Sequence, residues 1–252
     1  MNYSRESYIS TPIFFRKYLL NFLHKKENLI IFDIGSCEGE DSIRYSNLFP
    51  NASIFSFEPL PKNQELIIEN IKKYKVKNIK LIPLAVDNKM GSCTFYMSSG
   101  EPKEALNKDW TYGNKSSSLL PPEKHIEILP WIKFNNTLLV NTITLEYFIK
   151  ENNISEVNLI HLDVQGAELR VLESAKEYLN KIQVIWLEVS NVELYKDQPK
   201  RIDVESFMKE KGFTLYKSFM EGDFGDQMYV NNAIVNDTYM KIANFFKNAI
   251  SF

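Results

Sequence analysis

The chain has 252 residues, and its 44% hydrophobic and 13% aromatic content can bury a sizeable core within one large α/β domain. A net charge of −2, from 30 basic and 32 acidic residues, argues against a protein that neutralises nucleic-acid backbones or lies on anionic lipid. With two cysteines, no signal-like N-terminus and no apolar run of ~20 residues, we expect a cytoplasmic protein without a membrane span.

An amphipathic helix is predicted near the N-terminus. The segment Thr11–His24, TPIFFRKYLLNFLH, places aromatic and aliphatic residues at helical spacing after a Thr-Pro start signal. Its polar face carries few basic residues, so packing against the core is favoured over lying on a membrane surface.

The chain is organised around the stretch LIIFDIGSCEG. Leu29–Asp33 is predicted to be a buried parallel strand, because apolar side chains fill both of its faces. Gly35 and Gly39 mark a tight turn, and the helical pattern over 41–49 would direct free N–H groups at that turn. Together they indicate a nucleotide-binding strand, turn and helix. The glycine spacing, however, is not G-x-G-x-x-G, and Cys37 occupies the position of a middle glycine. An ordinary strand-to-helix turn is the alternative.

An acid closes the second predicted strand. Ser53–Phe57 is followed by Glu58, at the position where doubly wound folds hydrogen-bond the two hydroxyls of a ribose. Pro59 and Pro61 end the strand abruptly and keep the carboxylate at a crevice, which favours ribose binding over a solvated strand end.

Further elements continue the alternation of strands and helices. A helix over Lys62–Tyr74 and a strand over Ile79–Leu84 give the order β-α-β-α-β. Ala85 and Val86 then lie where a purine ring would sit if the ribose binds at the second strand. Cys93–Met97 is predicted to be a strand of a hairpin.

Residues 98–130 form an irregular insert that is rich in Gly, Pro, Ser and charges. A segment of this length in a compact domain is usually functional or mobile. Trp110 and Tyr112 are too apolar for a segment that never packs, so we expect a substrate-side lid that moves on substrate binding, with a surface loop as the alternative. If the lid closes over substrate, His125 becomes a candidate general base.

Buried strands in the second half of the chain also end in carboxylates. After a strand over Leu138–Thr142 and a helix over Leu145–Asn152, Asn158–Asp163 is predicted to be a buried strand followed by a turn and a helix over 167–177. Val184–Val189 is the next strand. Because the carboxyl ends of parallel strands meet at the ligand crevice, we expect four acids there: Asp33, Glu58, Asp163 and Glu188.

Gathered carboxylates repel one another unless a cation lies among them. A cationic ligand could fill this role, or a divalent ion such as Mg²⁺ held by Asp163, Glu188 and Asp226. In the metal-free alternative one of these acids is a general base, and capping of the following helix by Asp163 is a purely structural alternative. His161, inside the strand, is interpreted as a core histidine.

The sequence resembles the FkbM-type methyltransferases, a family of S-adenosylmethionine-dependent enzymes. The similar segments are FDIGSCEGEDS, FSFEPLPKN, LAVDNKMGSCTFYMS, NKSSSLL, VNTITLEYFI, HLDVQGAELRVLESA and WLEVSNVELYKDQP. They cover most of residues 29–230. We therefore expect an N-terminal helical extension (1–28), a methyltransferase domain (29–236) that contains the insert, and a C-terminal helix (237–252).

The resemblance implies an α/β, Rossmann-like class I methyltransferase fold, with a central, mostly parallel seven-stranded sheet flanked by helices and its last strands at Thr214–Lys217 and Gln227–Val230. It also implies transfer of a methyl group to oxygen, commonly a hydroxyl of a sugar or a secondary metabolite, with Asp163 beside the methyl group. It places Asp33, Gly35 and Gly39 at the methionine end of the cofactor and Glu58 at the ribose. The full set of candidate cofactor-binding residues is Asp33, Gly35, Ser36, Gly39, Glu58, Pro59, Ala85, Val86, Asp163 and Gln165. The candidate catalytic residues are Asp163, Glu188 and His125.

Two other functions stay open at this point. A nucleotide-sugar or NAD-dependent oxidoreductase also needs an acid after the second strand, but this chain lacks G-x-G-x-x-G. A non-catalytic nucleotide-binding α/β module would need no crevice acid beyond Glu58. The expected partner is a small-molecule or glycan acceptor rather than nucleic acid, and the sequence does not fix the oligomeric state.

Overall fold

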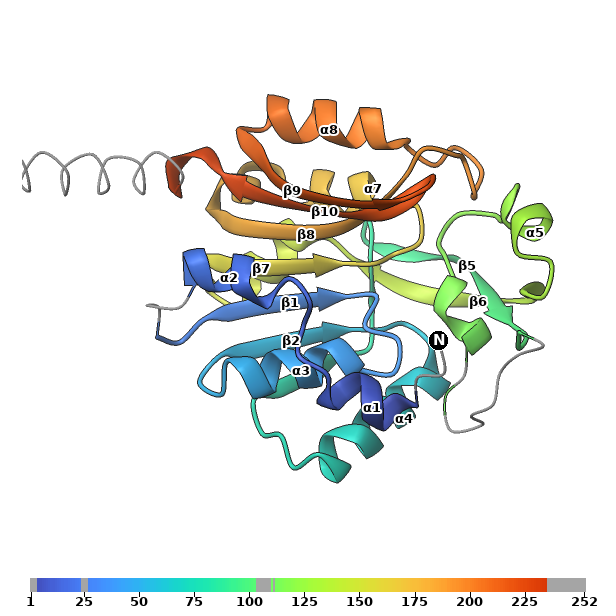
Figure 1. Cartoon of the computed structure of the whole chain (residues 1–252), viewed down its shortest axis with the longest axis horizontal. Coiled ribbons are helices and arrows are strands. Elements are labelled where there is room, and N and C mark those ends of the chain that lie inside the picture. Colours follow the sequence, from blue (N-terminus) through green and yellow to red (C-terminus); the bar gives the residue numbers. More distant parts are fainter. Residues whose placement is uncertain (1–3, 24–26, 103–109, 111, 235–252) are drawn as a thin grey trace, which may run out of the picture.

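The computed structural model describes residues 4–23, 27–102, 110 and 112–234, and the C-terminal helix predicted over 237–252 lies outside these ranges. At the centre of the described chain is a seven-stranded sheet (Figure 1). In spatial order its strands are β3 (Ile79–Ile82), β2 (Ser53–Phe57), β1 (Ile30–Ile34), β7 (Val157–Leu162), β8 (Ile182–Ser190), β10 (Phe224–Asn231) and β9 (Phe213–Glu221). The pairs from β3 to β8 are parallel, and β10 pairs antiparallel with β8 and β9. This confirms the predicted fold class.

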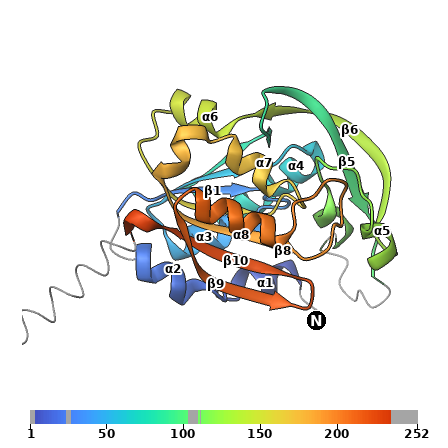
Figure 2. The ribbon, with the colours of Figure 1, turned by 90° about the horizontal axis from the view of Figure 1, so that it is seen from above.

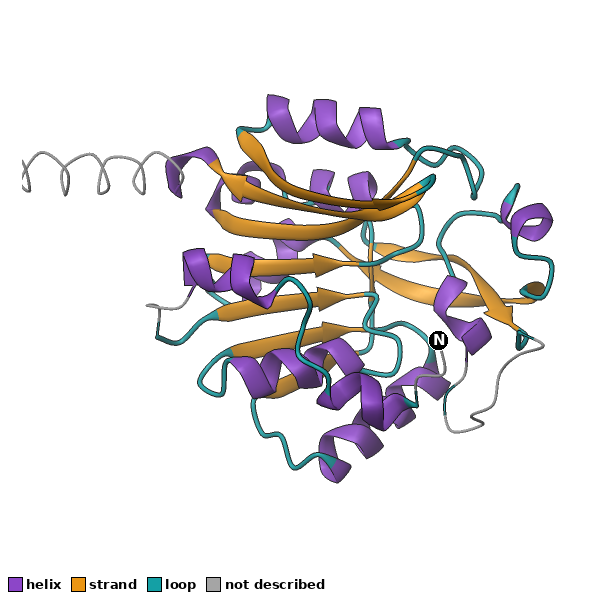
Figure 3. Cartoon of the chain, viewed as in Figure 1, coloured by secondary structure: helices purple, strands orange, loops and turns teal. Residues whose placement is uncertain are grey.

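Helices cover both faces of this sheet (Figure 3). The helices α2 (Arg16–Leu23) and α3 (Glu40–Leu48) lie on one face, and α6 (Leu145–Glu151), α7 (Glu168–Glu173) and α8 (Arg201–Glu210) lie on the other, while α4 (Pro61–Lys73) packs next to α3 and β3. Successive strand residues serve opposite faces: Ile31 joins the core under α2 and α3, and Phe32 joins the core under α6 to α8. Both faces of the parallel strands are therefore apolar, as the sequence indicated.

The helix predicted over 167–177 is wrong in its C-terminal half. Helix α7 ends at Glu173, and a 3₁₀ helix, η2 (Lys176–Lys181), follows. Ser174 between them accepts hydrogen bonds from the first turn of α6, through its Oγ to the N–H of Leu145 and through its carbonyl oxygen to the N–H of Glu146. The chain leaves the helix here because this residue supplies acceptors to a neighbouring helix start.

The helix predicted over 11–24 is present as α2 but begins later, at Arg16, and a second short helix, α1 (Arg5–Ser10), precedes it. A capping box between Ser4 and Ser7 begins α1, which lies in the predicted helical extension but before the helix whose bounds the sequence indicated. Pro12 lies in the link between the helices, where its lack of an N–H group is tolerated. The start signal at Thr11 and Pro12 therefore marks the end of one helix rather than the beginning of the next.

Residues of the predicted N-terminal extension complete the core on one face of the sheet. Leu19 and Leu23 are fully buried, and Phe15 is 4% exposed. The ring of Phe15 stacks on Trp186 of β8, with 3.5 Å between ring centroids and 10° between ring planes. This segment therefore contributes to the stability of the sheet that it covers.

Phe15→Ala is expected to lower the free energy of unfolding by about 3 to 5 kcal/mol, because it removes a buried aromatic ring and leaves a cavity against Trp186. The measurement is urea unfolding followed by tryptophan fluorescence and circular dichroism. Phe14→Ala is the control: that ring is 59% exposed, and we expect a loss of about 1 kcal/mol. Equal losses in the two variants would contradict the role given to Phe15.

A second, three-stranded sheet stands beyond the carboxyl ends of β1, β2 and β7, and arches away from them (Figures 1 and 2). Its strands, in spatial order, are β4 (Ala85–Val86), β6 (Lys133–Ile143) and β5 (Gly91–Ser99). The described part of the insert packs against it through η1 (Tyr112–Ser116), α5 (His125–Ile128) and the buried residues Leu119 and Leu120. Residues 103–109 and 111 lie outside the described ranges, and movement of the insert on substrate binding stays a prediction.

None of the helices in the described ranges combines the length and the apolar character needed to cross a bilayer.

Candidate functional site

The order of the strands reverses between β1 and β7. From β1 the chain proceeds outward through β2 and β3, and it then returns to the other side of β1 as β7 and β8. The loops that follow β1 and β7 therefore leave the sheet in opposite directions. In open α/β sheets the crevice at such a point, outside the carboxyl ends of the strands, is where ligands bind.

The loop after β1 lies against the backbone that follows β7. Gly35 has a φ of +83°, and a Cβ added there would lie 1.9 Å from the carbonyl oxygen of Asp163. A side chain at position 35 would therefore push the two loops apart. Cys37, in the place of a middle glycine, has a left-handed φ of 49°, and α3 begins directly after Gly39. The predicted tight turn followed by a helix is confirmed.

Two adjoining pockets open at this edge of the sheet, and the first combines apolar walls with two carboxylates, Glu58 and Asp163. Six of the predicted cofactor residues line it: Gly35, Glu58, Pro59, Ala85, Val86 and Asp163. Leu60, Leu84, Phe95 and Leu119 add apolar surface. Asn114 also lines this pocket, and its Oδ1 is buried without a hydrogen-bond partner among the described residues. The first pocket thus offers an apolar slot and unused acceptors, which suit an adenosine group with hydroxyl and amino donors.

Glu58 is the buried acid of the first pocket, with 4% of its surface exposed. The backbone N–H groups of Cys37 and Leu60 donate to its two carboxylate oxygens, at 3.0 and 2.8 Å. Burial raises the pKa of Glu58 to about 8, against the lowering effect of these hydrogen bonds. Each carboxylate oxygen can accept a further bond, so the side chain is held in place and can still bind two hydroxyl groups.

The second pocket is lined mainly by charged and aromatic side chains. It shares Gly35, Cys37, Lys115 and Asp163 with the first pocket. Its other lining residues are Tyr8, Asp33, Ser36, Glu40, Asp41, Trp110, Tyr112 and His161. Two more of the predicted cofactor residues, Asp33 and Ser36, therefore lie at the site, while Gly39 and Gln165 line neither pocket.

Asp33, at the end of β1, is 3% exposed. Ser42 donates to its Oδ2 at 2.5 Å, and Nδ1 of His161 lies 3.8 Å from its Oδ1. Burial raises the pKa of Asp33 to about 6, although His161 acts in the opposite direction. The ring of His161 packs against Phe15 and Tyr45, as expected of a core histidine, yet it also lines the second pocket and its Nδ1 has no hydrogen-bond partner among the described residues.

Gln165 lies between the acids at the ends of β7 and β8. Its Nε2 donates to Oδ1 of Asp163 and to Oε2 of Glu188, each at 2.7 Å. Its Oε1 lies 3.0 Å from Oη of Tyr195, which also lies 2.7 Å from the carbonyl oxygen of Ser116, so the two carboxylates are what direct the amide N–H groups. Burial and the charge of Asp163 raise the pKa of Glu188 well above its usual range. An amide therefore bridges the two carboxylates at the place where the sequence favoured a cation.

Asp226 lies opposite Glu188 in the ladder between β10 and β8. Burial, followed by the charge of Asp163, raises the pKa of Asp226 to about 6. Within the described ranges, no group of three or more His, Cys, Asp or Glu residues is arranged to hold a metal ion. The prediction of a Mg²⁺ site at Asp163, Glu188 and Asp226 therefore gains no support from the structure.

His125 lies outside both pockets. Its side chain is buried in the insert, and its ring meets the edges of Phe134 and Tyr195 with 5.2 Å between centroids in each pair. Burial lowers its pKa. This position, behind Tyr195, gives no support to the prediction that His125 acts as a general base.

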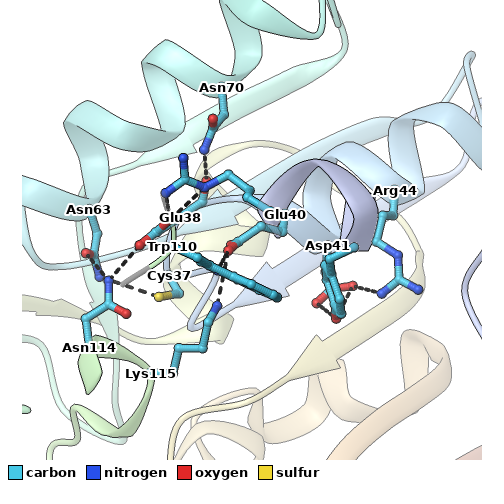
Figure 4. A network of polar contacts seen from close by, with 12 residues as sticks. Cys37, Glu38, Glu40, Asp41, Arg44, Asn63, Asn70, Trp110, Asn114 and Lys115 are labelled. Atoms are coloured by element: carbon cyan, nitrogen blue, oxygen red, sulfur yellow. Dashed lines mark hydrogen bonds and ion pairs between the residues drawn. The ribbon is translucent and has the colours of Figure 1, made fainter. Parts of the chain in front are cut away.

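A polar network that the sequence analysis did not assign to the site ties the insert and α1 to the loop after β1 (Figure 4). Its links are Asn114 to Glu38, Lys115 and Trp110 to Glu40, Arg5 to Glu38, and Tyr8 to Asp41. Nothing in the local pattern of the sequence pairs these residues, which are 33 to 76 positions apart. For Asn114 and Lys115 the sequence did hold a signal, because both lie in the segment NKSSSLL, which resembles the methyltransferase family.

Comparisons with known proteins agree with this site. The family model described as "Methyltransferase FkbM domain" matches residues 33–215. The chain is 31% identical over 213 residues to "2-O-methyltransferase NoeI" of Sinorhizobium fredii, covering 84% of this chain and 83% of that protein. It is 22% identical over 194 residues to "Methyltransferase 1" of Beauveria bassiana, covering 75% of this chain and 74% of that one.

Among solved structures, the magnesium protoporphyrin IX methyltransferase of Synechocystis superposes with a TM-score of 0.48 at 11% identity, over 90% of this chain and 79% of that one. The family match and the relative from Sinorhizobium fredii each cover most of the chain, and the matched region contains both pockets except for Tyr8. The chain therefore belongs to the FkbM methyltransferase family, and it is an S-adenosylmethionine-dependent methyltransferase, as its sequence resemblance implied.

Proposed function

We propose that the protein transfers a methyl group from S-adenosylmethionine to a hydroxyl oxygen of a sugar, a glycan or another small molecule. The observation that carries this proposal is the pair of adjoining pockets at the strand ends, which share Asp163. The similarity to a 2-O-methyltransferase supports oxygen as the methylated atom. Because the chain belongs to a methyltransferase family, we no longer retain the hypothesis of a nucleotide-sugar or NAD-dependent oxidoreductase.

The two pockets suit the two ends of this cofactor. The first pocket would hold the adenosine, with Glu58 accepting from the ribose hydroxyls and Ala85 and Val86 packing on the purine. The second pocket would hold the methionine end. S-adenosylmethionine supplies a methyl group on a cationic sulfonium and also carries an ammonium group, so the acids Asp33 and Asp163 complement its positive charge.

Asp163 is the acid best placed to handle the acceptor proton, because it lines both pockets whereas Glu188 lines neither. A sugar hydroxyl is a weak nucleophile near neutral pH, so its proton must be removed as the oxygen reacts. The Gln165 amide holds one oxygen of Asp163 and leaves the other, Oδ2, without a hydrogen bond from a described residue. We assign the role of general base to Asp163, positioned by Gln165 and Glu188.

The second pocket also has surfaces for an acceptor. Tyr8, Trp110 and Tyr112 present aromatic side chains there. Aromatic faces bury the apolar side of a ring while neighbouring polar groups bind its hydroxyls, which suits a carbohydrate or a comparable small molecule. A glycan panel, with methyl transfer from radiolabelled S-adenosylmethionine as the readout, would identify the acceptor and distinguish an enzyme from a non-catalytic binding module. The cytoplasmic location stays a prediction.

Glu58→Gln is expected to weaken binding of S-adenosylmethionine by about 10- to 100-fold, because hydrogen bonds to a charged group contribute about 1.5 to 3 kcal/mol. The pKa of Glu58 is raised to about 8 in the free protein, so this carboxyl holds its proton below that pH. Ribose hydroxyls favour the charged form, so binding should release a proton and tighten as the pH rises towards about 8. Calorimetry in buffers of different ionisation enthalpy measures both effects.

Glu173→Gln, an exposed acid of α7, is the control and should bind and release protons as the wild type does. If Glu58→Gln bound the cofactor with wild-type affinity and wild-type proton release, Glu58 would be removed from the site. If the wild-type protein bound no S-adenosylmethionine at all, the proposed function would fail.

A further inference from the structure

Lys115 is a half-buried cation between the two pockets. It comes from η1 in the insert and lines both of them. Its Nζ donates to Oε1 of Glu40 at 3.1 Å and lies 4.6 Å from the ring centroid of Trp110 (Figure 4). An ammonium group has three N–H donors, and the structure assigns one of them to a described residue. Two donors therefore remain for a ligand.

The second pocket otherwise carries a strong excess of negative charge. Four carboxylates line it: Asp33, Glu40, Asp41 and Asp163. These acids suit a sulfonium and an ammonium group. The methionine end of the cofactor, however, also carries an α-carboxylate, and that group would be repelled by the same four acids unless a cation met it.

Among the lysines and arginines of the described ranges, Lys115 lines the second pocket and the others do not. Arg44 is engaged by the carboxylate of Asp41 and the carbonyl oxygen of Thr11, and Arg5 is engaged by Glu38, and neither arginine lines this pocket. His161 does line it, but its Nδ1 faces the carboxylate of Asp33 at 3.8 Å. The cation that can meet a ligand carboxylate is therefore Lys115.

We propose that Nζ of Lys115 binds the α-carboxylate of the methionine group of S-adenosylmethionine. This inference rests on the proposed function and adds a specific recognition residue to it. Burial by itself would lower the pKa of Lys115, but the charge and hydrogen bond of Glu40, together with the neighbouring Cys37 and Glu38, more than reverse this effect and keep the pKa above its usual range. The side chain is therefore charged over the whole range in which the protein would work.

The contact gives part of the insert a role in cofactor binding. Glu40 begins α3 directly after the Gly35–Gly39 turn, so its bond with Lys115 ties η1 to the loop that would hold the cofactor. A ligand carboxylate on the same ammonium group would join the insert and the loop through one cation. Cofactor binding should therefore fix η1 in place before the acceptor enters.

The test compares two ligands that differ only in the carboxylate: S-adenosylmethionine and decarboxylated S-adenosylmethionine. Their dissociation constants are measured by calorimetry for the wild type, Lys115→Met and Lys115→Gln. Lys115→Met should weaken binding of S-adenosylmethionine by about 10- to 100-fold and binding of the decarboxylated analogue by less than about threefold. Lys115→Gln, whose amide can still donate to Glu40, should give the same selective loss.

Lys115→Arg keeps the charge and should restore most of the discrimination between the two ligands. Lys124→Met, at an exposed position of the same insert, is the control and should bind both ligands as the wild type does. Equal weakening of both ligands in the Met and Gln variants would show that Lys115 only supports Glu40 and Trp110, and it would overturn the inference. Wild-type affinity in these variants would overturn it as well. Failure of the wild type to bind S-adenosylmethionine would instead remove the proposed function.

Discussion

Replacing Asp163 by asparagine is expected to lower kcat for methyl transfer by about 100- to 10,000-fold, while the dissociation constant of S-adenosylmethionine changes by less than about tenfold. Asp163 lines both pockets, so it can meet the cofactor and the acceptor together. Asparagine keeps the shape of the side chain and an acceptor for the Gln165 amide, but it cannot take a proton at neutral pH. The effect should therefore fall on kcat rather than on binding.

The measurement combines single-turnover transfer of a radiolabelled methyl group, to the acceptor found with the glycan panel, with calorimetry of cofactor binding. Asp223→Asn, an exposed acid near the end of β8, is the matched control and should retain wild-type kcat. Glu188→Gln separates the two candidate bases, because Glu188 contacts Gln165 but lines neither pocket. A larger loss of kcat in Glu188→Gln than in Asp163→Asn would transfer the role of general base to Glu188.

Gly35→Ala is expected to lower the free energy of unfolding by about 3 to 5 kcal/mol and to abolish measurable cofactor binding. Two costs add at this position. The φ of +83° strains any residue with a Cβ, and that Cβ would lie 1.9 Å from the carbonyl oxygen of Asp163, which is backbone and cannot rotate away. The loops after β1 and β7 would have to separate. Because Gly35 and Asp163 of these loops line both pockets, the separation would also distort the cofactor site.

Gly212→Ala isolates the first of these costs. Gly212 has nearly the same φ, +81°, but no atom lies within 4 Å of the position that its Cβ would take. We therefore expect it to lose about 1 to 2 kcal/mol and to bind the cofactor normally. Urea unfolding and calorimetry measure both variants. Losses of the same size would mean that the close approach of Gly35 to Asp163 has no energetic consequence.

The sequence by itself determined the parallel half of the sheet and the acids at its edge. Parallel strands covered on both faces are mostly apolar, so β1, β2, β7 and β8 stand out as predominantly apolar runs. A carboxylate at the end of such a run lies near the carboxyl end of a strand, so the sequence predicted Asp33, Glu58, Asp163 and Glu188 at one crevice. The first three line the pockets, and Glu188 lines neither of them. The tight turn at Gly35 and Gly39 could also be predicted from the sequence, because left-handed φ angles favour glycine.

Tertiary structure decided which distant side chains complete the site. Lys115 and Trp110 reach Glu40 across 75 and 70 residues, and Tyr8 reaches Asp41 from a helix that showed no clear pattern in the sequence. Such contacts depend on how irregular segments close onto the sheet, and local periodicity carries no information about that closure.

The same reason explains two expectations that the structure does not support. His125 has the chemistry of a base, but the packing of the insert buries its ring behind Tyr195. Asp163 and Glu188 lie near each other, as the order of the strands requires, but the amide of Gln165 lies between them where a cation was expected. Sequence pattern fixes which charges gather at a sheet edge, whereas the three-dimensional position of one intervening side chain, Gln165, decides how their repulsion is relieved.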